Sequence, residues 1–202
     1  MSQQQFYTNY FNNVTETLNT LDHASLNSII EAILEVYHNK GTIYIFGNGG
    51  SGATASHIAG DFVKGVSYGL EKRFKMICLS DNTPGVSAIS NDVSYEDIFV
   101  EQLKNFLEPH DMAIGLSGSG NSENVMRALN YAKEKGAKTA ALCGFSGGKA
   151  KETVDHCLYA KIDDMEIAED IHMIALHVIK QSIIKELGKE GKSMGMKYDE
   201  RV

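Results

Sequence analysis

The stretch TIYIFGNGGSGATASH, residues 42–57, joins three kinds of sequence. Thr42–Phe46 is a short run of β-branched and aromatic residues, typical of a strand. Gly47–Ser51 is a glycine-rich loop, and a helix is expected to start after it. In such a unit the backbone N–H groups and the positive end of the helix dipole face whatever lies on the loop. The loop lacks the lysine of a Walker loop and the spacing of a dinucleotide site, so an anion could bind here and no nucleotide cofactor is expected.

Four further apolar runs repeat the strand pattern, at residues 74–79, 111–117, 138–144 and 157–161. Segments with helical periodicity separate them, such as ENVMRALNYAKEKG at 123–136. Buried parallel strands have continuous apolar runs and alternate with helices. The sequence therefore predicts an α/β fold, a three-layer αβα sandwich around a five-stranded parallel sheet.

Helices are predicted at both ends of this core, within a single domain over residues 1–202. Residues 26–41 place apolar residues at three- and four-residue spacing and end at Gly41, a typical helix C-terminus. Residues 164–187 form a long amphipathic pattern, and the Gly/Lys-rich tail after it is expected to fray. The expected parts are N-terminal helices, the core with the C-terminal helix, and the tail, at 1–40, 41–187 and 188–202.

The chain has 202 residues, 43% of them hydrophobic and 22% charged, as in an ordinary globular protein. Its formal net charge is −7 and its Lys and Arg residues are scattered, so we expect neither nucleic acid nor a membrane as partner. The N-terminus has no signal-peptide pattern, and no apolar stretch approaches the roughly 18–20 residues of a membrane span. Cys78, Cys143 and Cys157 lack CxxC spacing, which favours buried reduced thiols. We therefore expect a cytoplasmic protein.

A second loop, in LSGSGNSENV at residues 116–125, also follows a predicted strand and precedes a helix. Ser117, Ser119 and Ser122 supply three hydroxyl groups that can donate to phosphate oxygens, and the glycines permit close backbone approach. Ligands of open parallel sheets collect at the carboxyl ends of the strands. Either loop alone is equally compatible with a plain turn, but the two together favour a phosphate-bearing ligand.

Several motifs of the chain occur in a familiar order, namely GNGGSGATASH, SAISNDVSYEDIF, LSGSGNSENVMRALNYAKEKG, GGK and EDIHMIALHVI. Together they resemble the sugar isomerase (SIS) domain and, within it, the phosphoheptose isomerases, over roughly residues 5–187. The resemblance implies the SIS form of the α/β fold and the interconversion of sedoheptulose 7-phosphate and D-glycero-D-manno-heptose 7-phosphate. It also implies a homotetramer with active sites between subunits.

The resemblance also implies roles for individual residues. The acid–base groups would be Asp61 and His177. A divalent metal, most simply Zn²⁺, would be held by His57, Asp61, Glu169 and His177. The phosphate would be held by Ser51, Ser117, Ser119 and Ser122, and the remaining substrate-binding residues would be Asn48, Gly49, Gly50, Asn91, Asp92, Gly118 and Glu169.

The spacing of these residues tests the metal set. His57 and Asp61 are four residues apart on one helix and so share a face. Glu169 and His177 are eight apart, roughly 12 Å along a straight helix and about 80° around it. One metal cannot easily take both from one chain, so the ligands come from two subunits or one of them is not a ligand. Glu169 with His172 is an alternative pair, although we favour His172 as a satisfied helix residue packed at an interface.

Four positions depart from the family pattern. Asp61 stands where the family has Glu and is one methylene shorter, and a shift of about 1 Å can cost roughly 100-fold in rate. Glu169 replaces Gln, and its charge beside Asp61 would favour a cation. Gly65 replaces an arginine, and Gly118 a threonine. The prediction is therefore a phosphosugar aldose–ketose isomerase, with isomerisation of another phosphosugar, or a non-catalytic sugar-phosphate sensor or scaffold, as the alternatives.

Overall fold

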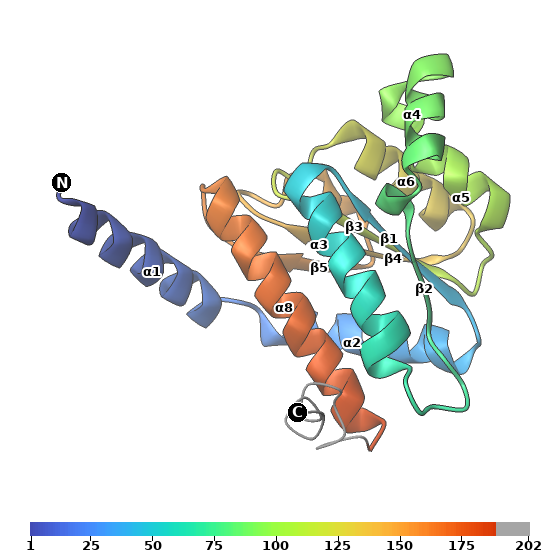
Figure 1. Ribbon diagram of the computed structural model, residues 1–202, viewed down its shortest axis with the longest axis horizontal. Coiled ribbons are helices and arrows are strands. Elements are labelled where there is room, and N and C mark those ends of the chain that lie inside the picture. Colours follow the sequence, from blue (N-terminus) through green and yellow to red (C-terminus); the bar gives the residue numbers. More distant parts are fainter. Residues whose placement is uncertain (189–202) are drawn as a thin grey trace, which may run out of the picture.

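The computed structural model describes residues 1–188 and contains a five-stranded parallel sheet with the order β2-β1-β3-β4-β5 (Figure 1). Each strand is short and apolar, as expected for strands buried between helices. The strand bounds are Thr42–Gly47 (β1), Lys75–Cys78 (β2), Met112–Ser117 (β3), Lys138–Cys143 (β4) and His156–Tyr159 (β5).

Alternate side chains of the sheet enter two separate cores. Ile43 and Ile45 of β1 pack with α2, α3 and α8, whereas Tyr44 and Phe46 pack with α5 and α6 on the other face. This alternation gives three layers, helix–sheet–helix, and confirms the predicted fold class (Figure 1). The helix bounds are Gln3–Asn19 (α1), His23–His38 (α2), Gly49–Gly60 (α3), Thr83–Asp92 (α4), Val100–Phe106 (α5), Glu123–Glu134 (α6), Gly148–Thr153 (α7) and Met165–Glu186 (α8).

The strand order reverses between β1 and β3, which are neighbours in the sheet. Gly47 at the end of β1 pairs with Leu116 near the end of β3. The two predicted loops therefore leave the sheet side by side at its switch point, the position where open α/β sheets bind ligands.

The N-terminal region differs in detail from the sequence prediction. The helix predicted from residue 26 begins at His23, because the Asp22 side chain accepts a hydrogen bond from the Ala24 N–H and caps it. It ends at His38, before Gly41. A separate helix, α1, precedes it and extends away from the sheet (Figure 1). The tail predicted at 188–202 lies, apart from Gly188, outside the described residues.

The cysteines are free thiols, as predicted, but they differ in burial. Cys78 and Cys143 are buried, whereas Cys157 is only partly buried. Cys157 lies on β5, a strand that pairs with β4 alone within the described sheet. The prediction of buried thiols is therefore confirmed for two of the three.

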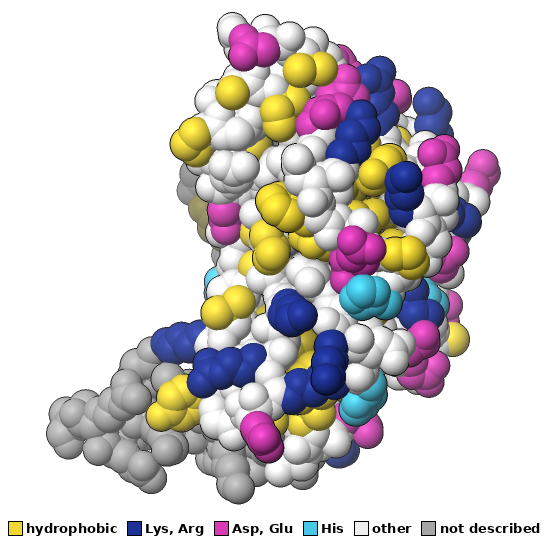
Figure 2. Space-filling view, turned by 90° about the vertical axis from the view of Figure 1, so that its right-hand side faces the viewer, with side chains coloured by type: hydrophobic (Ala, Val, Ile, Leu, Met, Phe, Trp, Pro, Cys, Tyr) yellow, Lys and Arg dark blue, Asp and Glu magenta, His cyan; other side chains and the backbone are white. Residues whose placement is uncertain are grey.

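Charged side chains of both signs cover the face in Figure 2, and apolar side chains lie among them. Val93, Tyr95 and Phe106, close to or at the ends of α4 and α5, are exposed apolar residues. Among the described residues, no helix has the length and apolarity needed to cross a membrane.

Candidate active site

The first loop ends in the uncapped N-terminus of α3. The side chain of the N-cap residue Asn48 makes no capping bond within the described chain, so it does not occupy the first-turn N–H groups of α3. Asn48 is held instead by Asn124 of α6, through two amide hydrogen bonds of 2.9 Å, and by the Tyr95 hydroxyl, which donates to Asn48 Oδ1 at 2.9 Å. These bonds join the first loop to the helix that follows the second.

The second loop is held by its own serines. Ser117 Oγ accepts from the Gly120 N–H at 3.1 Å and lies 3.1 Å from Ser122 Oγ. Ser119 Oγ accepts from the Asn121 N–H at 3.2 Å. Ser122 precedes α6 without capping it, again leaving first-turn N–H groups of a helix available. The two loops thus present backbone donors and hydroxyls at one edge of the sheet.

Two glycines of the second loop lie in close contacts. Gly120 has φ +67°, and a Cβ there would collide with the Gly147 backbone. A Cβ on Gly118 would collide with the Met165 sulfur, so Met165 covers the position where the family has threonine. Gly120 is therefore buried against the Gly147 backbone, and Gly118 is covered by a thioether.

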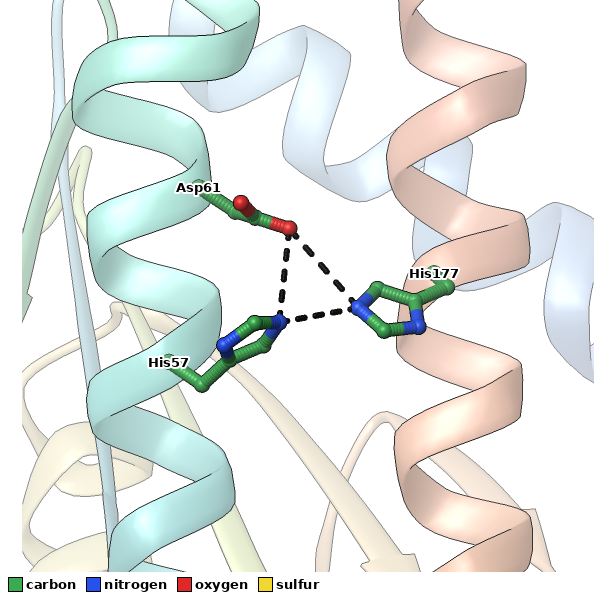
Figure 3. Close-up of side chains that lie close together, drawn as sticks. All are labelled: His57, Asp61 and His177. Carbon is green, nitrogen blue, oxygen red and sulfur yellow. Dashed lines mark hydrogen bonds and ion pairs between the residues drawn. The ribbon is translucent and has the colours of Figure 1, made fainter. Parts of the chain in front are cut away.

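A cluster of three side chains joins the far end of α3 to α8 (Figure 3). His57 Nε2 and His177 Nε2 lie 3.0 Å apart. Asp61 Oδ2 lies 3.6 Å from His57 Nε2 and 3.7 Å from His177 Nε2. Asp61 follows α3 directly, at the start of a π-helical segment, Asp61–Val66. We call His57, Asp61 and His177 the three-residue cluster.

The spacing of the three-residue cluster suits a metal ion. One ligand atom from each residue lies within 4.8 Å of the other two. Ligands at about 2.0–2.1 Å from a tetrahedral zinc ion lie roughly 3.3 Å from one another, close to the three separations in the cluster. Two imidazoles and one carboxylate are also a donor set that zinc accepts. The residues present therefore fit such an ion.

Glu169, the fourth expected metal ligand, lies outside this group. A Cβ on Gly50 would collide with the Glu169 carboxylate, and Ser51 Oγ lies 3.5 Å from Glu169 Oε1. Glu169 thus lies over the first turn of α3, while the cluster lies at its end. Within one chain the structure does not bring Glu169 to the metal set, as the helical spacing indicated.

His172, the alternative partner of Glu169, is buried in its own chain. It is 2% exposed, and neither ring nitrogen has a hydrogen-bond partner among the described residues. The expectation of a satisfied residue at an interface is therefore wrong. Burial lowers the pKa of His172, and the nearby Cys143 backbone opposes this effect.

Asn91 and Asp92 lie at the end of α4, where Asn91 Nδ2 donates to Asp92 Oδ1 at 2.7 Å. A cavity of about 390 Å³ beside the first loop is lined by Asn48, Gly49 and Tyr95, among other described residues, but not by Asn91 or Asp92. Its volume is typical of small-molecule sites. Within the described part of the chain, the three-residue cluster is not among its lining residues.

Lys180 was not predicted from the sequence, although it lies three residues after His177 on the same helical face. Its Nζ donates to Asp61 Oδ2 at 2.6 Å. Gly65 lies beside it, since a Cβ there would be 3.7 Å from Lys180 Cε. The cation near Asp61 therefore comes from α8, and not from position 65.

The environment of His177 favours its neutral form. Burial lowers the pKa of His177 most, and the neighbouring His57 and Lys180 lower it further, while Asp61 opposes them. The imidazole is therefore neutral near neutral pH, with one ring nitrogen available to accept a proton or bind a cation.

Known proteins match this chain in sequence and in structure. A family model described as the SIS domain matches residues 6–144. A phosphoheptose isomerase of Helicobacter pylori (strain P12) is 37% identical over 76% of this chain and 80% of its own length. One from Clostridium acetobutylicum is 35% identical over 87% of this chain and 86% of its own length.

Among solved structures, phosphoheptose isomerase GmhA from Neisseria gonorrhoeae superposes with a TM-score of 0.84 at 25% identity, over 91% of this chain and 100% of that one. The Francisella tularensis enzyme, at 24% identity and a TM-score of 0.80, shows the same fold. With its switch-point loops and its five-stranded parallel sheet, this chain belongs to the SIS-domain family and, within it, to the phosphoheptose isomerases.

Proposed function

We propose that this chain interconverts sedoheptulose 7-phosphate and D-glycero-D-manno-heptose 7-phosphate, as an aldose–ketose isomerase. The observation that carries this function is the course of α3, which begins at the first loop and ends at the three-residue cluster. His57 lies six residues after Ser51, roughly 9 Å along the helix axis, a separation that an extended sugar phosphate bridges.

The phosphate end of the substrate is assigned to the two loops. Backbone N–H groups at the starts of α3 and α6 and the hydroxyls of the loop serines are donors suited to a phosphate. The net charge of −7 makes such local donors more important, because the chain as a whole does not attract anions. The substrate set is proposed to comprise Asn48, Gly49, Gly50, Ser51, Asn91, Asp92, Ser117, Gly118, Ser119, Ser122 and Glu169.

The reacting end of the substrate is assigned to Asp61 and His177. Aldose–ketose isomerisation moves a proton between adjacent carbons through an enediol, so it needs a base at the C–H bond and an acid at the neighbouring oxygen. Asp61 Oδ2 and His177 Nε2 are 3.7 Å apart and both partly exposed, so both can reach one bound sugar. The neutral imidazole of His177 can accept a proton and return it.

The three-residue cluster would also be the site of a divalent metal, and its nitrogen and carboxylate donors favour zinc. His57, Asp61 and His177 would hold the ion through Nε2, Oδ2 and Nε2. A bound metal would stabilise, as a Lewis acid, the negative charge that develops on the enediol oxygen. The lone pairs that bind the ion are the ones that proton transfer requires.

A homotetramer in the cytoplasm is proposed for the assembled protein. The outward face of α1 carries Phe6, Tyr7 and Phe11, which are 58%, 52% and 67% exposed. An apolar helix face that extends from the fold is suited to packing against another subunit (Figure 1). Packing of this kind would allow a second subunit to complete the site.

Incubation of the protein with sedoheptulose 7-phosphate in D₂O, followed by NMR, tests the function. We expect the aldose to form, with deuterium at the carbon that exchanges its proton through the enediol. Metal-stripped and zinc-supplemented protein should be compared in parallel, with the dephosphorylated sugar as the substrate control.

A second outcome distinguishes the alternatives. If neither form of the protein reacts while the phosphosugar still binds, the isomerase function is wrong and a sugar-phosphate sensor is favoured. If another phosphosugar reacts and the heptose does not, the reaction class is retained and the substrate is corrected.

A further inference from the structure

The carboxylate of Asp61 is already paired with a cation of the same chain. Lys180 Nζ lies 2.6 Å from Asp61 Oδ2, and this is the oxygen that also faces His57 Nε2 and His177 Nε2, at 3.6 and 3.7 Å. The oxygen that a metal would share with the two imidazoles therefore accepts a hydrogen bond from an ammonium group.

Local structure keeps this ammonium in place. Lys180 is one helical turn after His177 on α8, so both side chains point toward α3. Gly65, which has no side chain, lies against the end of the lysine stem. The lysine and aspartate side chains are 18% and 25% exposed, so solvent and salt screen this pair less than a pair on the surface.

The charge of Lys180 acts against a second cation. The ammonium neutralises the carboxylate, which is the only anionic member of the three-residue cluster. A divalent ion among the three residues would lie a few ångströms from this ammonium, where like charges repel, more strongly in a partly shielded site than in water. To bind the ion, the protein must therefore either move the Lys180 ammonium away from Asp61 Oδ2 or bind the ion more weakly because of this repulsion.

We propose that Lys180 is a positioning residue that serves as the resident cation of the three-residue cluster, holding Asp61 beside the two histidines and weakening metal binding there. Its catalytic consequence rests on the proposed isomerase function. While Lys180 pairs with Asp61, the nitrogen of His177 is not occupied by a metal and is available for proton transfer. Lys180 would thus favour proton transfer over metal binding, the two processes that use the same lone pairs.

Calorimetric titration of the metal-stripped full chain with Zn²⁺ tests this proposal. We expect Lys180→Met to bind Zn²⁺ at least about tenfold more tightly than the wild type, because the repulsion is removed. Lys64→Met is the matched control: Lys64 is exposed and three residues after Asp61, so its charge is screened and the affinity should change by less than about twofold. Adding His57→Ala to Lys180→Met should remove the gain.

The opposite sign would overturn the proposal. A lysine that only oriented a metal-ligating carboxylate would, when removed, weaken Zn²⁺ binding by about 10–100-fold. The proposal is excluded if Lys180→Met binds Zn²⁺ with an unchanged or lower affinity. It is also excluded if neither protein binds Zn²⁺. Lys180→Arg keeps the charge and should retain the wild-type affinity, and Lys180→Gln replaces Lys180→Met if that variant does not fold.

Turnover in the presence of a chelator provides an independent readout. Lys180→Met should lower kcat with a smaller change in KM, since Lys180 acts on Asp61 and not on the phosphate loops, and Lys180→Arg should recover most of kcat. The Zn²⁺ titration needs no substrate. A wrong isomerase function would therefore appear as absent turnover in the wild type, while the titration would still decide the role of Lys180.

Discussion

His57 and His177, which are 120 residues apart in the chain, bring their Nε2 atoms to 3.0 Å from each other. At this separation the two nitrogens cannot both carry a proton, so at least one imidazole is neutral and presents a lone pair. The lowered pKa of His177 agrees with this, since burial is its main cause. The contact depends on the packing of α3 against α8, and it brings a base, a carboxylate and a cation together.

His177→Ala should abolish isomerisation while leaving the fold intact. The side chain is 44% exposed, so little packing is lost, whereas loss of a general acid–base group costs about 10²–10⁴-fold in rate. Steady-state turnover, together with circular dichroism and thermal unfolding, measures both effects. Exposed His110→Ala is the control, and near-normal turnover in His177→Ala would remove His177 from the mechanism.

Ser119→Ala should weaken binding of phosphorylated ligands chiefly. A hydrogen bond to a charged group contributes about 1.5–3 kcal/mol, which corresponds to a loss of roughly tenfold or more in affinity. Calorimetry with a phosphosugar and its dephosphorylated form measures the difference, with Ser182→Ala, near the end of α8, as the control. Equal losses for both sugars would contradict the phosphate assignment.

Gly120→Ala should destabilise the fold more than Gly69→Ala. Both glycines have a positive φ, +67° and +75°, so alanine costs about 1–2 kcal/mol at either position. A Cβ at Gly120 would also collide with the Gly147 backbone, whereas nothing lies within 4 Å of one at Gly69. We expect Gly120→Ala to lose at least about 2 kcal/mol more in urea unfolding, and equal losses would show that the second loop can move to accept a side chain.

His172 should make the fold sensitive to acid. Its pKa is lowered in the folded chain, so the unfolded chain binds the proton more readily. The resulting stability is fully present above the usual histidine pKa of about 6.5 and is lost as the pH falls below it, at up to about 1.4 kcal/mol per pH unit. When the pH is lowered from about 7.5 to about 5.5, the free energy of unfolding of His172→Leu should therefore fall by about 1 kcal/mol less than that of the wild type.

Urea unfolding of both proteins, at one protein concentration and over this pH range, measures this difference. If His172→Leu keeps the full acid sensitivity, another group is responsible for it. Neither ring nitrogen of His172 has a hydrogen-bond partner among the described residues. A protonated ring would therefore be a buried charge without a partner, which costs much more free energy than a neutral ring.

Local patterns determined which segments form strands and loops. Continuous apolar runs predicted the strands to within a few residues, and the two Gly/Ser loops were found because both directly follow such runs. The four-residue spacing of His57 and Asp61 was enough to place both on one face. The start of α2 was missed, because the Asp22 cap is not part of the apolar periodicity.

The meeting of distant residues was decided only by the tertiary structure. Periodicity places Glu169, His172, His177 and Lys180 on one helix, but it does not say which of them face α3. The packing of α8 directs Glu169 to the first turn of α3, buries His172, and brings His177 and Lys180 to Asp61. The sequence by itself therefore determined the sheet, the loops and the chemical types of the site residues. Helix packing decided which of these residues contact one another, because a contact between residues 120 positions apart leaves no pattern in the local sequence.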